Sequence, residues 1–198
     1  MKKLNLLELF AESGNRLAWH CEPAVWNIDR DRLIITSDAE TDFWQRTHYG
    51  FTADNGHFLH MALDGDFTIE TRVRCDFKNQ YDQAGLMIRI SDACWVKTSV
   101  EYEPDEPNKL GVVVTNHGYS DWSTQDVDDS FIDFKLMLVR EGSDYIVKYF
   151  SEIDQDWIQM RMFHLFDQPQ VKAGLYCCSP KAGGFTAKFD YFKIEGIN

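Results

Sequence analysis

The feature that most constrains the fold is an alternation of apolar and polar side chains over residues 66–77. The side chains of Phe67, Ile69 and Val73 alternate there with the charged side chains of Glu70 and Arg72. Successive side chains of an extended strand point to opposite faces, so this pattern predicts a strand with one buried and one wet face. Similar runs occur at 57–63, 83–91, 94–103, 109–116, 132–140, 144–151, 156–165, 170–177 and 184–195.

Turn-forming residues separate these runs, as at Asp64-Gly65 and at Glu141-Gly142-Ser143. No long amphipathic helix lies between them, and a short helix is expected only at 4–11. Many short strands without intervening helices favour an antiparallel two-sheet sandwich of the jelly-roll type. We therefore predict an all-β protein that forms one domain over residues 1–198. In the last run the alternation slips near Asp190-Tyr191, which predicts a β-bulge.

Charge limits the partners that such a domain can have. The chain carries 20 Lys and Arg against 32 Asp and Glu, a formal net charge of -12. Nucleic acids and anionic membranes are recognised by basic patches, so neither is expected as a partner. A small saccharide or another neutral polar ligand fits the composition, and cationic ligands are also permitted. The first 14 residues are interpreted as part of the fold and not as a secretion signal, because Asn5 and Glu8 interrupt the apolar run.

The five cysteines show no CxxC spacing, which argues against a zinc site. Most of them fall in or beside strand-like runs, where a reduced thiol acts as a small hydrophobic group. Cys177 and Cys178 are adjacent in one run, so their thiols should face opposite sides of the sheet. This usage predicts a reduced, cytoplasmic protein.

One face of the run at 94–103 has an unusual composition. Trp95, Lys97, Ser99 and Glu101 alternate with apolar residues and so should line one side of a strand. One interpretation is a wet strand face with a Lys–Glu pair. The other is a ligand groove on the concave face of the sandwich, with Trp95 as a stacking platform and Lys97 and Glu101 as polar contacts.

Two further stretches could contribute to the same groove. The run at 80–89 should place Tyr81, Gln83 and Gly85 on one side of a strand, and Gly85 indicates close approach of a backbone or a ligand. The stretch 115–123 is interpreted as a turn at Asn116, His117 and Gly118, followed by a loop that carries Asp121 and Trp122. Exposed rings on such a loop would suit stacking on a sugar, whereas the alternative is that the polar side chains bond the local backbone.

The segment TDFWQRTHYGF, at 41–51, mixes rings with charged and hydroxyl groups. In an extended chain Asp42 and Trp44 lie on one side and Phe43 on the other. Tyr49 needs a turn at His48 or Gly50 to join the first group. The segment is predicted to form one wall of the groove, and a buried structural corner is the rival interpretation.

Catalysis is a weaker alternative. A glycoside hydrolase or lyase would use Glu101 as acid or base with Asp42 or Asp121 as the second carboxylate. Glu103 and Asp105 are spaced like glucanase acids, but prolines bound them, so a solvated loop is expected there.

No metal or cofactor is predicted. His57 and His60 are three residues apart in a strand-like run, so their rings should face opposite ways. Calcium at the acidic stretches 64–66 and 126–129 is conceivable, but exposed acidic turns are the favoured interpretation.

An ordered set of motifs carries a family resemblance. The segments TDFWQRTHYGF, YDQAGLMIR, WVKTSVEY, VVVTNHGYSDWS and AGLYCCSP follow one another along the chain, which closes with GFTAKFDYFKIE. In this order the chain resembles a family of uncharacterised concanavalin A-like jelly-roll proteins that includes the fungal "regulation of enolase" protein. The resemblance spans about residues 19–194. It implies a lectin/glucanase-type sandwich and says little about activity.

The resemblance also implies a set of polar family positions. They are Asp42, Trp44, Tyr49, Tyr81, Gln83, Lys97, Glu101, Asp121 and Trp122. Several of these are the residues that the alternation places on one face. We therefore expect a non-catalytic, lectin-like protein that binds carbohydrate through these side chains and Trp95. A hydrolase or lyase and a protein-interaction module, with a protein as partner, are the alternatives.

Overall fold

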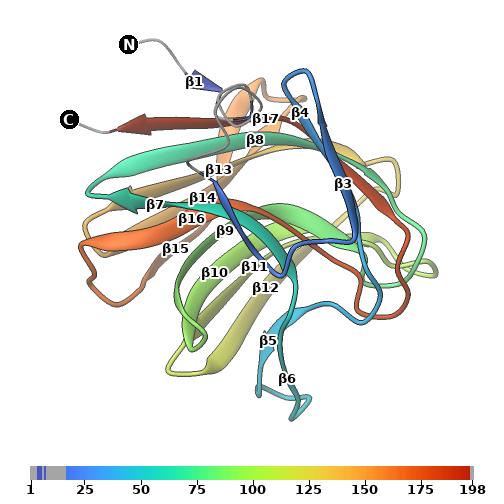
Figure 1. Cartoon of the computed structure of the whole chain (residues 1–198), viewed down its shortest axis with the longest axis horizontal. Helices are drawn as coiled ribbons and strands as arrows, with labels where there is room; N and C mark the ends of the chain where they lie inside the picture. The colour runs from blue at the N-terminus through green and yellow to red at the C-terminus, as the bar shows by residue number, and fades with distance from the viewer. Residues whose placement is uncertain (1–3, 6, 8–16, 197–198) are drawn as a thin grey trace.

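The computed structural model describes residues 4–5, 7 and 17–196. Its regular elements are strands arranged in two large antiparallel sheets and one small sheet (Figure 1). The helix expected at 4–11 falls mostly outside the described residues, and Leu4–Asn5 form a strand. The first sheet has the order β15-β14-β13-β8-β17-β4-β3, with β1 also paired to β17. Its strands are β1 (Leu4–Asn5), β3 (Val25–Asp29), β4 (Arg32–Thr36), β8 (Phe67–Asp76), β13 (Asp133–Glu141), β14 (Asp144–Ser151), β15 (Asp156–His164) and β17 (Thr186–Gly196).

The second sheet has the order β12-β11-β10-β9-β16-β7-β2. It packs against the first sheet, so the all-β two-sheet sandwich expected from the alternation is confirmed. Its strands are β2 (Ala18–His20), β7 (His57–Asp64), β9 (Gln83–Ser91), β10 (Cys94–Glu101), β11 (Asn108–Asn116), β12 (Tyr119–Val127) and β16 (Gln170–Cys178). The bulge in β17 is also present, because the register shifts between Phe189 and Tyr191.

The main core lies between the two sheets. It is built from the apolar positions of the alternating runs, for example Ile69 and Val73 of β8 and Leu86 and Ile88 of β9. Burying these side chains removes apolar surface from water, and this stabilises the fold by about 25 cal/mol per Å² of surface buried. This burial is the principal force that holds the two sheets together.

A second hydrophobic cluster lies on the other side of the second sheet. The strands β5 (Phe43–Gln45) and β6 (Thr52–Asp54) form a separate hairpin, which Figure 1 shows on the concave side of that sheet. The cluster combines rings and aliphatic groups of the hairpin and the sheet: Phe43, Trp44, Phe58, Met87, Trp95, Val113, Tyr176 and Cys178. The hairpin thus covers the middle of a sheet face that would otherwise be open to solvent.

The two adjacent cysteines lie in different hydrophobic clusters. Cys177 belongs to the main core and Cys178 to the cluster under the hairpin, so the two thiols face opposite ways as predicted. All five cysteines are free, and burial raises the pKa of Cys177 and Cys178 well above that of an ordinary thiol.

Candidate functional site

The register of the second sheet determines which side chains meet on its concave face. Lys97 of β10 lies between Met87 of β9 and Val113 of β11. Four residues further along β10, Glu101 lies beside Gln83. The opposite face of β10 carries core residues such as Val96 and Val100, so the predicted division of this strand into two faces is correct.

The concave face of β10 is not wet, however. The side chain of Lys97 is only 4% exposed, and its ammonium Nζ lies 3.0 Å from Oδ1 of Asp42. Asp42 immediately precedes β5, so this ion pair fastens the hairpin to the sheet. The predicted Lys–Glu pair is therefore replaced by a Lys97–Asp42 pair. Its two charges stabilise each other where few water molecules can reach them, and the carboxylate raises the pKa of Lys97 against the opposing effect of burial.

Glu101 is held by an amide and not by a cation. Nε2 of Gln83 donates to Oε2 of Glu101 at 2.9 Å and to the backbone oxygen of Tyr81 at 3.1 Å. Oε1 of Gln83 accepts from the hydroxyl of Tyr176 at 3.3 Å, so both ends of the amide are fixed. Burial raises the pKa of Glu101 to about 8; Lys97 opposes this shift, and Asp42 adds to it. At neutral pH the carboxyl group is therefore mostly protonated.

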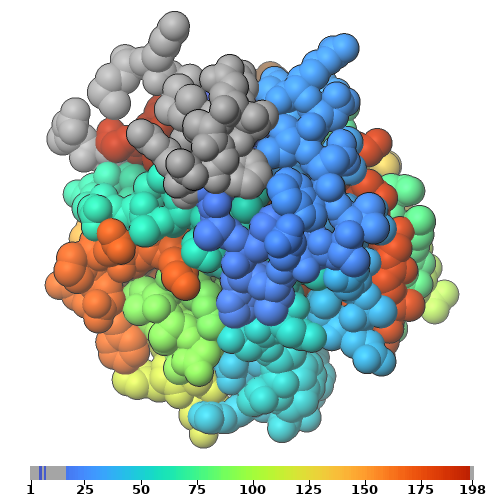
Figure 2. All heavy atoms as spheres, in the orientation of Figure 1, coloured from blue at the N-terminus to red at the C-terminus, as the bar shows by residue number. Residues whose placement is uncertain are grey.

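Two further contacts hold the hairpin in place. Arg89 of β9 forms a bidentate ion pair with Asp54 of β6, in which Nη1 donates to Oδ1 and Nη2 donates to Oδ2 at 2.8 Å. On the other side, Oγ of Ser120 in β12 accepts from the backbone N–H of Gln45 at 2.9 Å. In the space-filling view the hairpin, in cyan, meets the yellow-green start of β12 at the lower edge of the molecule (Figure 2).

The hairpin loop brings Tyr49 into position by a compact turn. Arg46 and His48 have positive φ angles of 56° and 62°, and Gly50 follows with 72°. Such left-handed angles cost a residue with a Cβ about 1 kcal/mol or more, and the surrounding contacts must offset this cost. The indole Nε1 of Trp44 donates to the backbone oxygen of Thr47 at 3.1 Å. The sequence required a turn at His48 or Gly50, and the loop turns at both.

Eight of the ten predicted site residues meet in one cavity of about 570 Å³, which we call the concave pocket. The eight are Asp42, Trp44, Tyr49, Tyr81, Gln83, Lys97, Glu101 and Trp122. Trp44 is only 8% exposed, so the segment at 41–51 is partly the buried corner and partly the wall of the pocket. Trp122 is 37% exposed and presents an accessible ring.

Trp122 has room because its neighbour in β11 lacks a side chain. A Cβ on Gly111 would lie 2.8 Å from Nε1 of the indole. Gly85, in contrast, is a packing glycine, since a Cβ there would lie 1.9 Å from the backbone oxygen of Thr98. The sequence left the role of Gly85 open between a ligand and a backbone contact, and the structure shows the backbone contact.

The structure corrects two predicted positions. Trp95 has no exposed surface and packs edge-on against Phe43, with ring centroids 6.1 Å apart, so it cannot be a stacking platform. The hairpin, which the strand pattern of β10 does not reveal, covers it. Asp121 lies outside the concave pocket and forms an ion pair with Arg161 of β15 at 3.0 Å.

Asp121 is also separated from Glu101. In the sheet register Glu101 pairs with Lys109, which pairs with Asp126, five residues along β12 from Asp121. Five residues of a strand span roughly 16 Å, so the proposed acid pair of Glu101 and Asp121 is wrong. The turn predicted at Asn116, His117 and Gly118 is present at 117–118, but Asp121 and Trp122, which were predicted on a loop after it, lie in the strand β12.

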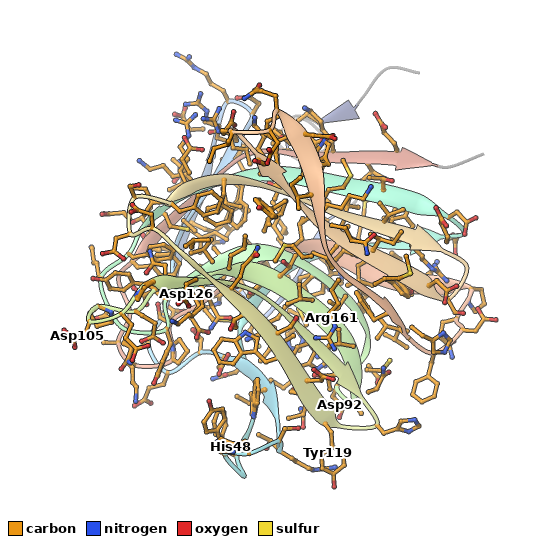
Figure 3. All side chains as sticks on the ribbon, turned by 180° about the vertical axis from the view of Figure 1, so that it is seen from behind. His48, Asp92, Asp105, Tyr119, Asp126 and Arg161 are labelled. Atoms are coloured by element: carbon orange, nitrogen blue, oxygen red, sulfur yellow. The ribbon has the colours of Figure 1, made fainter. Side chains whose placement is uncertain are left out.

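Asp121 instead lines a second cavity of about 890 Å³, which we call the edge pocket. It lies where β12 approaches β15, and it is lined among others by His48, Asn116, Tyr119, Asp121, Arg161 and His164. Figure 3 shows His48 near Tyr119 at one end of the sheet, whereas Asp105 and Asp126 lie at the other end. Trp44, Tyr49 and Trp122 line both pockets.

Sequence reasoning missed several lining residues of the concave pocket. They are Glu40, Phe51, Ala53, Glu103, Val113, Pro180 and Lys181. Val113 could have been found, because it alternates with core residues of β11. Glu103 follows the end of β10, as expected, but it is half-buried and accepts from Nε2 of Gln80 at 2.8 Å. Lys181 comes from a distant turn, and its Nζ lies 5.4 Å from the ring centre of Tyr81.

Within residues 4–5, 7 and 17–196, no group of three or more metal-ligating side chains is assembled. The acidic turns have other partners. Oδ1 of Asp66 accepts from the backbone N–H of Gly142 at 2.7 Å, and Oδ1 of Asp128 accepts from Ser130. In the same part of the chain, no helix is long and apolar enough to cross a bilayer.

The fold and the covered concave face define a concanavalin A-like β-sandwich protein. The lectin I-B4 of Griffonia simplicifolia aligns over the full length of both chains with a TM-score of 0.60 and 11% identity. The chain named "Bacteroides ovatus Xyloglucan PUL GH43B" aligns with a TM-score of 0.71 and 14% identity over 93% of this chain and 37% of that one. Both likenesses concern the fold.

The chain belongs to the family "Protein of unknown function (DUF1349)", whose model matches residues 19–197. It is 32% identical to "Regulation of enolase protein 1" of Saccharomyces cerevisiae, over 89% of this chain and 87% of the relative. A crystal structure of a functionally unknown protein from the same yeast aligns with a TM-score of 0.86 and 31% identity, over 92% of this chain and 97% of that one. The family resemblance inferred from the ordered motifs is thus confirmed.

Proposed function

We propose that this protein binds a saccharide in the concave pocket without cleaving it. The observation that carries the proposal is the convergence of exposed rings and fixed polar groups on one cavity. The exposed rings of Trp122 and Tyr49 and the half-buried ring of Tyr81 offer faces on which the C–H groups of a pyranose can pack. Gln83 is almost fully buried and both hydrogens of its Nε2 are used, so its amide serves to hold the carboxyl of Glu101 in place. The other oxygen of that carboxyl can contact a hydroxyl group without reorganising.

The volume and the charge of the pocket support this ligand class. A cavity of about 570 Å³ falls in the range typical of small-molecule sites. Lys97 at its floor is neutralised by Asp42, so the pocket does not require an anion. The fold of the lectin I-B4 is compatible with this function, although fold alone does not establish it.

The test is a glycan array followed by titration calorimetry with the sugars that bind. We expect Trp122→Ala to weaken binding about tenfold or more, because it removes a stacking face. Trp157→Ala is the matched control, since Trp157 lies on β15 of the other sheet and packs on Phe150. Absence of binding across a broad array, or equal losses in both variants, would refute the proposal.

A second candidate is acid catalysis by Glu101. A carboxyl group that keeps its proton near neutral pH is the group that a general acid requires, and the pKa of Glu101 is raised to about 8. Asp42 is the remaining candidate for the second carboxylate. Hydrolysis of aryl glycosides by the wild type, abolished in Glu101→Gln, would replace the binding proposal with this one.

A regulatory protein–protein interaction is the third candidate, and it rests on the name of the yeast relative. Among the described residues the exposed apolar side chains include Val25, Ile153 and Met162, which come from different strands and turns. Co-purification from the native organism would favour this function if one partner is recovered in stoichiometric amount and a saccharide ligand does not displace it.

A further inference from the structure

We propose that the saccharide is a linear chain several units long, which runs from the concave pocket past Trp122 into the edge pocket. This inference rests on the proposed function and specifies the length and the path of the ligand. It starts from the observation that the two cavities share three lining residues, Trp44, Tyr49 and Trp122. A single sugar would occupy only part of one cavity.

The shared residues lie at the boundary of the two cavities, and this is where the proposed passage runs. Trp44 lies beneath, with its ring centre 5.5 Å from that of Tyr49. Tyr49 is contributed by the hairpin loop and Trp122 by the edge strand β12, so the passage lies between these two elements. Both outer rings are exposed, and a chain that passes between them can pack against either face.

The length of the path follows from the sheet register. The concave pocket reaches the row of Glu101, which pairs with Lys109 of β11, and the edge pocket reaches Asn116 of the same strand. Seven residues of a strand span roughly 23 Å. This distance exceeds one or two sugar rings, and it predicts that several linked units make contact.

The edge pocket supplies polar groups suited to hydroxyls. The Arg161 guanidinium is held by Asp121, with Nη2 and Oδ1 3.0 Å apart, and its Nη1 donates to the backbone oxygen of Asp121. Asn116 is fixed by a bond from Nδ2 to the backbone oxygen of His164 at 3.0 Å. Tyr119 adds an exposed ring at the outer end, and Figure 3 shows it near the hairpin loop.

The experiment is a titration of the wild type with homologous series of cello-, xylo- and manno-oligosaccharides, each from the monomer to the hexamer. In the series that binds, we expect the affinity to rise at least about tenfold beyond the dimer, and then to stop rising once the path is filled. Equal affinity for the dimer and the hexamer would overturn this inference and leave the proposed function intact. If none of the three series binds, this inference fails, whereas the proposed function is decided by the broad glycan array.

Two variants test whether the additional contacts of the longer ligands lie in the edge pocket. Tyr119→Ala and His164→Ala change exposed side chains that line only this pocket. We expect each to lower the affinity for the hexamer about threefold or more and to leave the affinity for the dimer unchanged. Trp122→Ala should weaken both ligands. A loss of dimer and hexamer binding by the same factor in the edge-pocket variants would contradict the proposed path.

Discussion

The two faces of the second sheet contrast in the way they are buried. The face toward the first sheet is covered by aliphatic and aromatic side chains, among them Leu86, Val96 and Leu175. The concave face is covered by a hairpin of two three-residue strands, and beneath this hairpin aromatic rings lie beside two partly buried ion pairs, Lys97–Asp42 and Arg89–Asp54. The first face only has to exclude water. The second also presents charged and amide groups to a cavity, and its charges are stable there because each has a partner.

The largest expected effect on stability comes from truncating a side chain of the main core, and comparing it with a truncation under the hairpin tests whether the two regions unfold together. Phe192→Ala in the main core should lower the free energy of unfolding by about 3–5 kcal/mol. Phe43→Ala should mainly release the hairpin, because Phe43 packs on Trp95 and Tyr176 in the second cluster. Denaturant unfolding and amide hydrogen exchange measure the two effects.

The hairpin bonds to follow by exchange are those donated by the backbone N–H groups of Arg46 and Gly50. They should exchange faster in Phe43→Ala, while amides of β8 and β17 keep their protection. Equal loss of protection in the hairpin and in the first sheet would show that the hairpin and the main core unfold as one unit.

Removing the charge of Lys97 beneath the hairpin should have the next largest effect on the free energy of unfolding. Lys97→Met leaves the Asp42 carboxylate without its cation and should lower the free energy of unfolding by about 3 kcal/mol. Adding Asp42→Asn should recover part of this loss, since no unpaired charge then remains. Lys188→Met, at an exposed position of β17, is the control and should be nearly neutral. If Lys97→Met matches this control, the ion pair does not stabilise the fold.

The pH dependence of stability should reveal the raised pKa of Glu101. Its pKa is about 8 in the folded protein and 4.5 without the surroundings of the fold, so between these values the folded state binds more protons than the unfolded state. Stability should therefore fall as the pH rises from about 4.5 to about 8, by up to about 1.4 kcal/mol per pH unit. Denaturant titrations of the wild type and Glu101→Gln test this expectation. The variant should lack this component of the slope, and identical slopes would contradict the raised pKa.

The smallest expected effect on stability concerns the outer rim of the concave pocket. Gly111→Ala should cost less than about 1 kcal/mol, because Trp122 lies on an edge strand and can shift. The shift should change the fluorescence of Trp122 and weaken ligand binding. Gly196→Ala, where a Cβ has open space, is the control. An unchanged emission spectrum and unchanged affinity would show that Gly111 does not shape the pocket.

Several elements follow directly from the sequence. The alternation in β8 to β11 and β13 to β17 reflects one face packed on a core and the other face turned away from it, so strand positions and the side-chain division of β10 could be predicted. The strand β12 was missed because its edge position leaves it largely exposed and without an apolar period. The strands β5 and β6 have three residues each, too few for a period to be recognised.

The sequence by itself determined the class of fold, the opposite directions of Cys177 and Cys178, and eight of the residues that line the concave pocket. Local alternation fixes which side of a strand each residue takes. Only the tertiary structure decided what covers that side. It buried Trp95 under Phe43, paired Lys97 with Asp42 and turned Asp121 toward Arg161. These contacts join segments tens of residues apart, and the periodicity of a single strand contains no information about its distant neighbours.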